Sequence, residues 1–415
     1  MHDTASSTLS PMPSTTPLSL TLPPSARAVL GLLERLAHGS LELRLPDGSL
    51  RRYGPGGRSD APHAVMHWPN WNVCAAVLRS GDIGLAESYI AGDWHSPDVS
   101  ALLRLLIANR DALEKTVYGS WWGALAYRLR HAFNRNSRSG SRRNIHAHYD
   151  LGNAFYRLWL DEGMSYSSAW FDGRPEQSLA DAQHAKMNRA LREVRLKTGD
   201  RLLEIGCGWG GLAQTAAWGF GAHVTGVTLS TEQLAWAQER IQGSGLRERV
   251  DLRLQDYRDL DEPPFDAVVS IEMFEAVGRR YWPDYFAAVA RLLKPGGRAC
   301  IQSITIRDDL FERYARSTDF IQQYIFPGGM LPSVSEFYRA ASQAGLVVKN
   351  QLSFGPDYAE TLRRWRERFH AEAPRMPALG FDSRFMRTWS FYLHYCEVAF
   401  DTGNTDVVQF TLEKP

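Results

Sequence analysis

Short apolar, β-rich runs alternate with amphipathic helical stretches from about Arg201 to the C-terminus. Alternation at this spacing is typical of a parallel sheet with helices on both faces, so the sequence predicts an α/β fold. Ser230 followed by Gln233 has the spacing of a capping box, which supports the start of the second helix. The predicted strands are "RLLEIG", "HVTGVTL", "VDLRLQD", "FDAVVSI" and "RACIQSI", and the predicted helices are "GLAQTAAWGF", "STEQLAWAQERIQG" and "YWPDYFAAVARLLKPGG".

An insertion at residues 308–332 follows the fifth strand, and "VSEFYRAASQAGLVVKNQLSF" then predicts a further helix and strand. The final "TDVVQFTLEK" predicts a closing strand. Earlier in the chain, "LELRLPDGSLRRYG" alternates around Asp47-Gly48, which predicts a hairpin. Two helices are predicted after it, "DIGLAESYIAGDW" and "DVSALLRLLIANRDALEKTV", with Ser80 and Ser96 near their starts.

These patterns divide the chain into segments. Residues 1–24 are rich in Ser, Thr and Pro and lack a basic start followed by an apolar stretch, so they predict a disordered tail rather than a signal peptide. Residues 25–118 form a smaller N-terminal α+β domain, interpreted as lipid-associated. A Ser/Arg/Gly-rich linker at residues 119–143 leads to the catalytic domain at residues 144–415.

Composition limits the class of protein. The chain has 415 residues, 44% hydrophobic and 22% charged, which is typical of a soluble protein with two domains. Its net charge of +1 predicts no bulk polyanion as partner. No apolar run is long enough to span a bilayer. Four cysteines without metal-ligand spacing indicate reduced thiols in a cytoplasm: Cys74, Cys207, Cys300 and Cys396.

One stretch of the chain is strongly basic. Between Thr116 and Tyr149 there is no acidic residue, and Trp121 and Trp122 precede a group of arginines. It is either a solvated linker or a surface that docks on anionic phospholipid. No recognised nucleic-acid-binding module accompanies it, so nucleic acid is not predicted. The arginines are Arg128, Arg130, Arg135, Arg138, Arg142 and Arg143.

The stretch "LLEIGCGWGG", residues 202–211, runs from a predicted strand into a glycine-rich turn. It satisfies the dinucleotide pattern G-x-G-x-x-G, which alone is weak evidence. Glu204, two residues before the first glycine, and the downstream "LLKPGG" favour S-adenosylmethionine, because both resemble class I methyltransferases. The second strand ends in "GVTLS" without a carboxylate for a ribose, so Gln233 or the backbone near Thr228 and Leu229 is expected to take that role.

Several longer motifs occur in order from Asn144 onward, and together they resemble cyclopropane-fatty-acyl-phospholipid synthases and the related mycolic-acid methyltransferases. The resemblance implies a Rossmann-like class I methyltransferase fold, with a seven-stranded, mostly parallel sheet. It also implies transfer of the methyl(ene) carbon of S-adenosylmethionine to the cis double bond of a phospholipid acyl chain, to form a cyclopropane. The motifs are "NIHAHYDLGNAFYRLWLDEGMSYSSAWF", "LLEIGCGWGGLA", "GVTLSTEQLAWAQER", "QDYRDL", "MFEAVG" and "YIFPGGMLPS".

This chemistry leaves a carbocation that must be kept from water and then lose a proton from the added methyl. In the family the base is a bound bicarbonate ion. The resemblance assigns its ligands to Glu275, Tyr358 and Ile304, whereas Ser168 stands for a cysteine and Gln302 for a histidine. Gln302 cannot carry a charge. The usual histidine after the glutamate is Ala276 here. These departures put ring closure in question more than methyl transfer.

The remaining site residues follow from the same resemblance. Cys396 matches a cysteine sometimes regarded as catalytic, although alkene methylation needs no thiolate. Glu272 is interpreted as structural, and Tyr149, Phe274 and Tyr358 are expected to line the site. The expected S-adenosylmethionine-binding residues are Tyr166, Ser167, Glu204, Gly206, Gly208, Gly210, Thr228, Leu229, Gln233, Asp256 and Tyr257.

Three alternatives remain open. A related fatty-acyl C-methyltransferase would leave a methyl or methylene branch without ring closure. A nicotinamide-dependent oxidoreductase is suggested by the glycine pattern, and a non-catalytic lipid-binding protein by the altered Ser168 and Gln302. The leading hypothesis places the protein in the cytoplasm at the inner face of the membrane, with unsaturated phospholipid as partner and a homodimer as the possible assembly.

Overall fold

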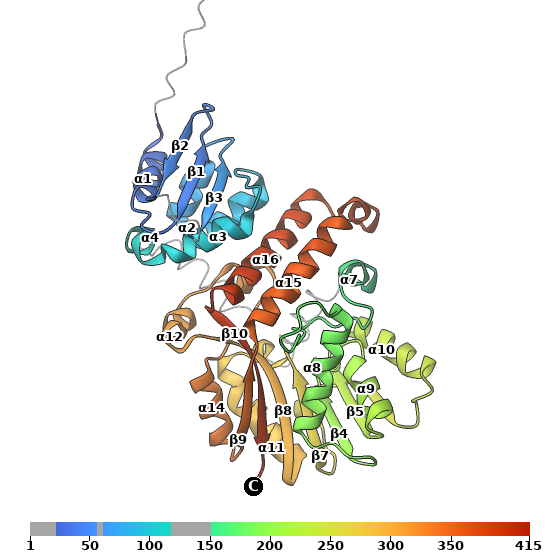
Figure 1. The fold of residues 1–415 in the computed structure, drawn as a ribbon. Coiled ribbons are helices and arrows are strands. Elements are labelled where there is room, and N and C mark those ends of the chain that lie inside the picture. The colour runs from blue at the N-terminus through green and yellow to red at the C-terminus, as the bar shows by residue number, and fades with distance from the viewer. Residues whose placement is uncertain (1–21, 56–60, 118–150) are drawn as a thin grey trace, which may run out of the picture.

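The computed structural model describes residues 22–55, 61–117 and 151–415 (Figure 1). The predicted tail up to residue 21, the basic linker with its arginines and tryptophans, and Tyr149 lie outside the described residues. These residues form a small N-terminal unit and a larger α/β unit, with a long helical hairpin of α15 (Gly355–Ala371) and α16 (Ser383–Asp401) between them (Figure 1). All four cysteines are free thiols, as predicted.

The larger unit is built on one seven-stranded sheet of order β6-β5-β4-β7-β8-β10-β9. The five strands from β6 to β8 run parallel, and β10 is antiparallel to both β8 and β9. This arrangement confirms the predicted fold class, including the closing strand. The strands are β4 (Arg201–Ile205), β5 (His223–Thr228), β6 (Val250–Leu254), β7 (Phe265–Ile271), β8 (Leu293–Ile306), β9 (Val347–Ser353) and β10 (Thr405–Glu413).

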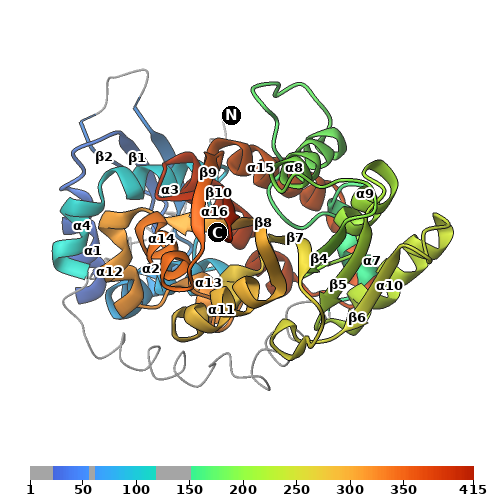
Figure 2. The same cartoon turned by 90° about the horizontal axis from the view of Figure 1, so that it is seen from below.

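Helices cover both faces of this sheet, because successive residues of a strand point to opposite faces (Figure 2). Leu202 of β4 packs in the cluster formed with α8, α9 and α10, whereas Leu203 packs in the cluster with α11 and α14. The near-continuous apolar strands therefore reflect burial on two sides. These helices are α8 (Leu179–Glu193), α9 (Gly211–Gly219), α10 (Thr231–Gly243), α11 (Trp282–Leu292) and α14 (Val334–Gln343).

The N-terminal unit has a three-stranded sheet, in which β1 and β2 form the predicted hairpin and β3 pairs with β1 in parallel. Two helix predictions are wrong in their limits. The first helix begins earlier and kinks at Gly81, and the second breaks at Asn109, with Asp98 rather than Ser96 as its N-cap. The elements are α1 (Pro24–Leu33), β1 (Ser40–Arg44), β2 (Leu50–Tyr53), β3 (His63–His67), α2 (Asn72–Ala91), α3 (Val99–Ala108) and α4 (Arg110–Val117).

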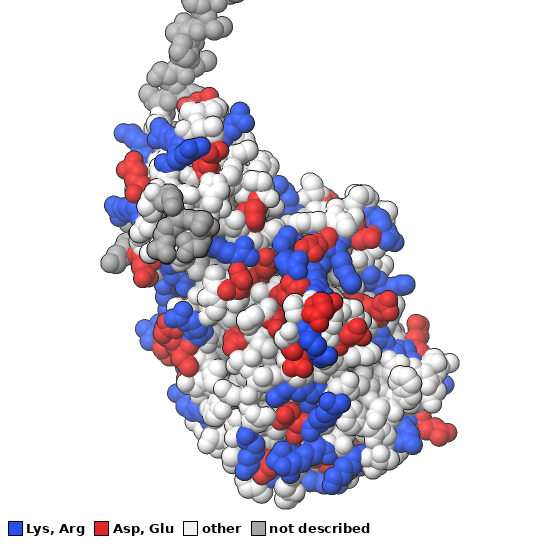
Figure 3. All heavy atoms as spheres, in the orientation of Figure 1, with Lys and Arg blue, Asp and Glu red and all other residues white. Residues whose placement is uncertain are grey.

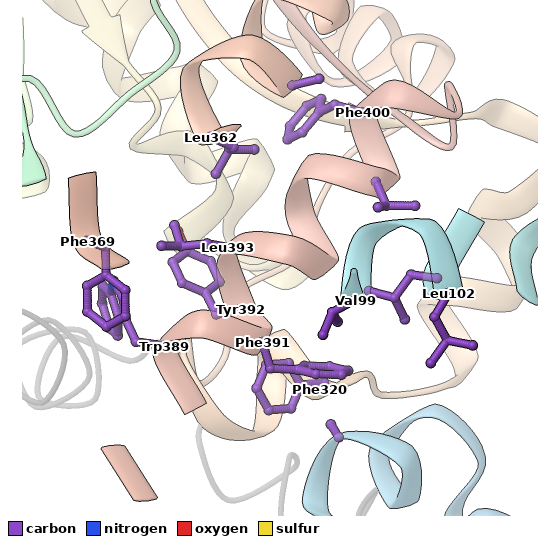
Figure 4. Packing of buried hydrophobic residues seen from close by; sticks show 14 of the residues in the cluster. Val99, Leu102, Phe320, Leu362, Phe369, Trp389, Phe391, Tyr392, Leu393 and Phe400 are labelled. Atoms are coloured by element: carbon purple, nitrogen blue, oxygen red, sulfur yellow. The ribbon is translucent and has the colours of Figure 1, made fainter. Parts of the chain in front are cut away.

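The two units meet along α16 through a continuous apolar cluster (Figure 4). Phe391 of α16 meets Phe320 edge-on, with ring centroids 5.1 Å apart, and Val99 and Leu102 of α3 belong to the same cluster. The remaining helices are α7 (Asn153–Trp159), α12 (Asp308–Arg316), α13 (Phe320–Tyr324), α15 (Gly355–Ala371) and α16 (Ser383–Asp401), with short 3-10 turns η1 (Tyr257–Asp259), η2 (Phe274–Ala276), η3 (Arg279–Tyr281) and η4 (Ala373–Leu379).

The surface is mixed in charge. On the face in Figure 3, basic and acidic side chains are interspersed over both units. In the part of the chain that the structure describes, no helix combines the length and the apolar character needed to cross a bilayer.

Two acidic residues of α16 at the interface between the two units differ in burial, and this difference predicts unequal effects on stability. Glu397 is buried and pairs with Arg366, at 2.8 Å, and with Arg104 of α3, at 3.3 Å, whereas Asp401 pairs with Arg104 at a half-exposed position. Glu397→Ala leaves a poorly exposed Arg366 without its carboxylate, so we expect it to lower the free energy of unfolding by about 3 kcal/mol. Asp401→Ala is the matched control and should cost no more than about 1 kcal/mol. Urea unfolding measures both, and equal losses would contradict this assignment.

Candidate active site

A cavity of about 190 Å³ opens at the carboxyl ends of β4, β5 and β7. In open α/β sheets this edge is where ligands bind, because the loops after the parallel strands meet there. The loop before α8 and the middle of α8, at Lys186 and Met187, close it from the other side. The lining residues are 163–167, 186–187, 204–209, 211–212, 227–229, 233, 255–258, 271–273 and 276–277. They include every residue predicted to bind S-adenosylmethionine except Gly210.

The glycine turn after β4 forms one wall of the cavity. Gly206, Gly208 and Gly210 have φ values of +85°, +51° and +80°, a region that favours glycine. A Cβ atom at Gly208 would meet nothing within 4 Å, so it would project into open space. A Cβ atom at Gly210 would lie 3.0 Å from that of Ala237 in α10. Gly210 therefore packs closely against α10 and does not line the cavity, and its predicted contact with the cofactor stays a prediction.

Polar side chains stand at the strand ends around this turn. Glu204 is buried at the end of β4, and its Oε2 atom has no hydrogen-bonding partner among the described residues. Burial raises the pKa of this carboxyl well above its usual range. Thr228 donates to the Gln233 side chain at 3.3 Å, and both line the cavity. Asp256 caps η1 and pairs with Arg258 at 2.6 Å. Of these groups, the Glu204 carboxyl has a buried oxygen without a partner at the cavity wall, which is typical of a position completed by a bound ligand.

Glu272 occupies the point where the predicted catalytic residues converge. Its Oε1 atom accepts hydrogen bonds from the Ser168 backbone N–H at 2.8 Å and from Gln302 Nε2 at 2.6 Å. Its Oε2 atom accepts one from the Tyr358 hydroxyl at 2.7 Å. The structure therefore brings Ser168, Gln302 and Tyr358 together, but around a carboxylate that the sequence analysis interpreted as structural. Glu272 itself borders the cavity.

The backbone at Glu272 is unusual. Its φ is +49°, directly after β7, and its N–H donates to the Gln302 carbonyl at 2.8 Å. A non-glycine residue in this left-handed region costs about 1–2 kcal/mol. The surrounding contacts must overcome this cost, since the turn after β7 holds the side chain toward Ser168 and Tyr358.

Gln302 is held by a chain of hydrogen bonds that starts in α8. Arg189 donates to Gln409 Oε1 at 2.6 Å, and Gln409 Nε2 donates to Gln302 Oε1 at 2.9 Å. Gln302 Nε2 is left pointing at Glu272. A histidine in this place could carry a charge, whereas the amide here acts only as an oriented donor.

Glu275 is the second carboxyl group, and it lies in η2 behind Glu272. Its Oε1 atom accepts the Ile304 backbone N–H, which brings two further predicted residues together. Within the described residues its buried Oε2 atom has no hydrogen-bonding partner. Desolvation, and next the negative charge of Glu272, raise the pKa of Glu275 from 4.5 to about 8.

The two carboxyl groups differ in the support given to their charge. Desolvation also raises the pKa of Glu272, but the positive charge of Lys186 and the hydrogen bonds from Ser168, Tyr358 and Gln302 oppose this rise. Glu272 therefore has a nearby cation and three donors that favour its negative charge, whereas the charge of Glu272 disfavours ionisation of Glu275. A pair of nearby carboxyls that titrate apart is common at catalytic sites.

Lys186 was missed by the sequence analysis. It is buried on the core face of α8, donates to Ser167 Oγ at 2.5 Å, and borders the cavity. Desolvation lowers its pKa to about 8, while Glu272, Asp161 and Glu204 act in the opposite direction. A signal was present, because Lys186 lies four residues from both Ala182 and Ala190 on the apolar stripe of the helix.

Two other predicted residues are placed away from the reacting groups. Phe274 is fully buried in an aromatic cluster with Trp282, Tyr285 and Phe286, and it packs the core rather than lining the cavity. Cys396 lies in α16 outside the lining, and burial raises the pKa of its thiol well above the usual range. An un-ionised thiol is a poor nucleophile or base.

A family model described as mycolic acid cyclopropane synthetase matches residues 136–410. The chain belongs to this family. A tuberculostearic acid methyltransferase of Mycobacterium tuberculosis is 41% identical over 399 residues, covering 94% of this chain and 91% of that protein. The cyclopropane-fatty-acyl-phospholipid synthase of Escherichia coli K12 is 37% identical over 372 residues, covering 89% and 93%. The predicted resemblance is confirmed.

Solved structures agree with this placement. A crystal structure of a mycolic acid cyclopropane synthase complexed with SAH and CTAB aligns with a TM-score of 0.62 at 35% identity, covering 66% of this chain and 98% of that chain. This member of the cyclopropane synthase family is thus an S-adenosylmethionine-dependent methyltransferase. The family membership favours that cofactor over the nicotinamide alternative.

The raised pKa of Glu275 predicts how stability changes with pH. The group is ionised in the unfolded chain above pH 4.5 but stays protonated in the fold up to about pH 8. The contribution of Glu275 to the free energy of unfolding is therefore complete below pH 4.5. It is lost as pH rises toward 8, and the free energy of unfolding falls by up to about 1.4 kcal/mol per pH unit.

Glu275→Gln, which is neutral at every pH, should flatten this fall in unfolding free energy between pH 5 and 8, with the exposed Glu239→Gln as control. Denaturant titrations across this range measure it. An unchanged slope in Glu275→Gln would show that Glu275 is not the group responsible.

Proposed function

We propose that this protein transfers the methyl group of S-adenosylmethionine to a cis double bond in a phospholipid acyl chain. A hydride shift then moves the positive charge to the methylated carbon, and loss of a proton from the added carbon leaves a methylene branch. The observation that carries this proposal is the charged carboxylate at the edge of the cavity, held by Ser168, Gln302 and Tyr358. A double bond is a weak nucleophile, so the reaction needs a strong electrophile and then a base.

The cavity suits S-adenosylmethionine. Gly206 and Gly208 let the backbone approach a ligand, and α9 begins just beyond them, with its first residues Gly211 and Leu212 in the cavity lining. Glu204 offers an unpaired carboxylate oxygen, and Gln233 and Tyr257 flank the far side. When bound, the cofactor supplies an electrophilic methyl group. These residues would hold and orient it, which leaves the edge near Glu272 for the acyl chain.

Aromatic packing beside this edge suits a cationic step. Tyr166 lines the cavity, donates to or accepts from the Tyr392 hydroxyl at 2.7 Å, and contacts the rings of Tyr156, Trp159 and Trp365 at centroid distances between 5.4 and 5.5 Å. Such a wall excludes water, and each ring face can stabilise a cation by about 0.5–2 kcal/mol. The acyl carbocation would survive there until it loses a proton.

A bound bicarbonate base, which the family resemblance implies, does not fit the residues in place. The Ser168 N–H, the Gln302 amide and the Tyr358 hydroxyl, which would bind it, already donate to Glu272. A further anion at this point would face that charge. We therefore derive no step through bicarbonate.

The choice of a branch over a ring rests on the altered residues Ser168, Gln302 and Ala276, which put ring closure in question. It is also supported by the relative that covers 94% of this chain, which is named a methyltransferase. A saturated methyl branch would need a reductant, so the proposed product keeps its double bond as a methylene. Cyclopropane formation, the leading hypothesis from sequence, is the second candidate, favoured by the Escherichia coli relative. A homodimer and contact with the membrane surface remain predictions of the sequence.

The direct test incubates the full chain with methyl-labelled S-adenosylmethionine and vesicles of phospholipid with cis-monounsaturated chains. We expect label in the acyl chains, and proton NMR of the fatty esters should show the two vinylic protons of a methylene branch. Ring protons at high field would select the second candidate instead. No label in any lipid, with the cofactor bound, would contradict methyl transfer and favour a non-catalytic protein.

The cofactor assignment predicts a difference between two glycines of similar backbone conformation. Gly208 and Gly245 have φ values of +51° and +69°, and a Cβ atom at either meets nothing within 4 Å, but only Gly208 lines the cavity. Gly208→Ala and Gly245→Ala should therefore destabilise the fold alike, while only Gly208→Ala weakens cofactor binding, by about tenfold or more. Calorimetry measures both, and equal affinities would show that the glycine turn does not contact the cofactor.

A further inference from the structure

We propose that the Glu272 carboxylate is itself the base that takes the proton from the added carbon, standing where the relatives hold a separate anion. This inference rests on the proposed function. It assigns a catalytic role to Glu272, which was interpreted from the sequence as structural. It is carried by the placement of one side chain among three donors at the edge of the cavity.

The hydrogen bonds show that Glu272 fills an anion site completely. A carboxylate presents two oxygens on one planar carbon, as a bicarbonate ion does. One oxygen of Glu272 receives the Ser168 N–H and the Gln302 amide, and the other receives the Tyr358 hydroxyl. All three donors come from residues that the resemblance assigned to binding the base. They position the carboxylate rather than react.

Glu272 is also the member of this group that faces the cavity. Ser168, Gln302 and Tyr358 are buried behind it, whereas Glu272 is only partly buried and lies in the cavity wall. Two other carboxylates reach the wall, but each has a different setting. Asp256 is paired with Arg258, and Glu204 stands beside the glycine turn at the end of β4. A base for the acyl chain is therefore best supplied by Glu272.

The backbone supports the same conclusion. Glu272 holds a left-handed conformation that glycine adopts freely. Strained residues of this kind persist where the surroundings fix them, and they cluster at functional sites. The strain directs the carboxylate toward the donors.

The groups around Glu272 favour its negative charge through three hydrogen bonds and one nearby cation. The groups that face it are Lys186 from α8, Glu275 from η2 and Tyr358 from α15. Lys186 favours the ionised form of Glu272, whereas desolvation and the charge of Glu272 raise the pKa of Glu275 to about 8, which disfavours a second negative charge on the pair. Desolvation raises the pKa of Glu272 above its ordinary value, which strengthens it as a base.

The step balances without another reactant. The π electrons of the double bond form the new C–C bond, and the electron pair of the breaking S–CH₃ bond stays on sulfur. A hydride shift moves the positive charge to the methylated carbon. Glu272 then takes a proton from the added methyl, and the C–H electron pair becomes the double bond between the added carbon and the acyl chain. The proton leaves to solvent after product release. The lipid gains one CH₂ in total.

The first experiment compares wild type with Glu272→Gln, using the vesicle assay in buffer freed of carbon dioxide and bicarbonate. Wild type should keep its full rate there. Glu272→Gln should lower kcat by about 10²-fold or more, and methylated alcohols should appear as water captures the cation. Glu239→Gln on the surface of α10 is the matched control. Loss of wild-type rate without bicarbonate, or a normal kcat in Glu272→Gln, would overturn the proposal.

A second variant guards against misfolding, because Glu272→Gly suits the backbone conformation. It exposes the three donors, so added bicarbonate should restore much of its rate while leaving wild type unchanged. Calorimetric titration of bicarbonate into cofactor-loaded protein should show binding to Glu272→Gly and none to wild type. This binding measurement needs no catalytic turnover, so it tests the inference even if the protein methylates none of the lipids tried. Binding to wild type, or none to the variant, would contradict it.

Discussion

The site depends on one carboxylate kept charged in a largely desolvated place. Glu272 is stabilised there by a backbone N–H, an amide and a phenol, with Lys186 supplying the opposite charge. Each donor is contributed by a different part of the chain: the segment before α8, β8 and α15. Removing water from a charge is costly unless hydrogen bonds replace it. The fold therefore has to bring these segments together with hydrogen-bond precision, and the rest of the architecture serves that requirement.

The arrangement of layers shows how this is done. The parallel strands β4, β5 and β7 end at one edge and present the glycine turn, Thr228 and Glu272 to a common cavity. The antiparallel β10 then places Gln409 beside Gln302 and lets Arg189 of α8 fix the amide. The hairpin of α15 and α16 supplies Tyr358 on one side, and on the other it packs against the N-terminal unit through Phe391. That unit thus supports the helices that carry part of the site.

Much of this could be predicted from sequence, and what could not has physical reasons. The strands and helices could be predicted from the hydrophobic pattern, because a strand that is buried on both faces appears in the sequence as an apolar run. The family motifs predicted most of the residues that line the cavity, and they singled out Ser168, Gln302 and Tyr358, which the structure brings together around Glu272. The direction of the Glu272 side chain could not be predicted, since it depends on a left-handed φ that no pattern encodes for glutamate. The kink at Gly81 and the break at Asn109 likewise depend on tertiary packing.

The central claim is that the protein carries its own anion at the point where the added carbon loses a proton. A crystal structure of the chain with S-adenosylhomocysteine, grown with excess bicarbonate, tests this most directly. The account predicts density for the Glu272 carboxylate on the Ser168 N–H, the Gln302 amide and the Tyr358 hydroxyl. A bicarbonate ion on these donors, with the Glu272 side chain turned away, would contradict it.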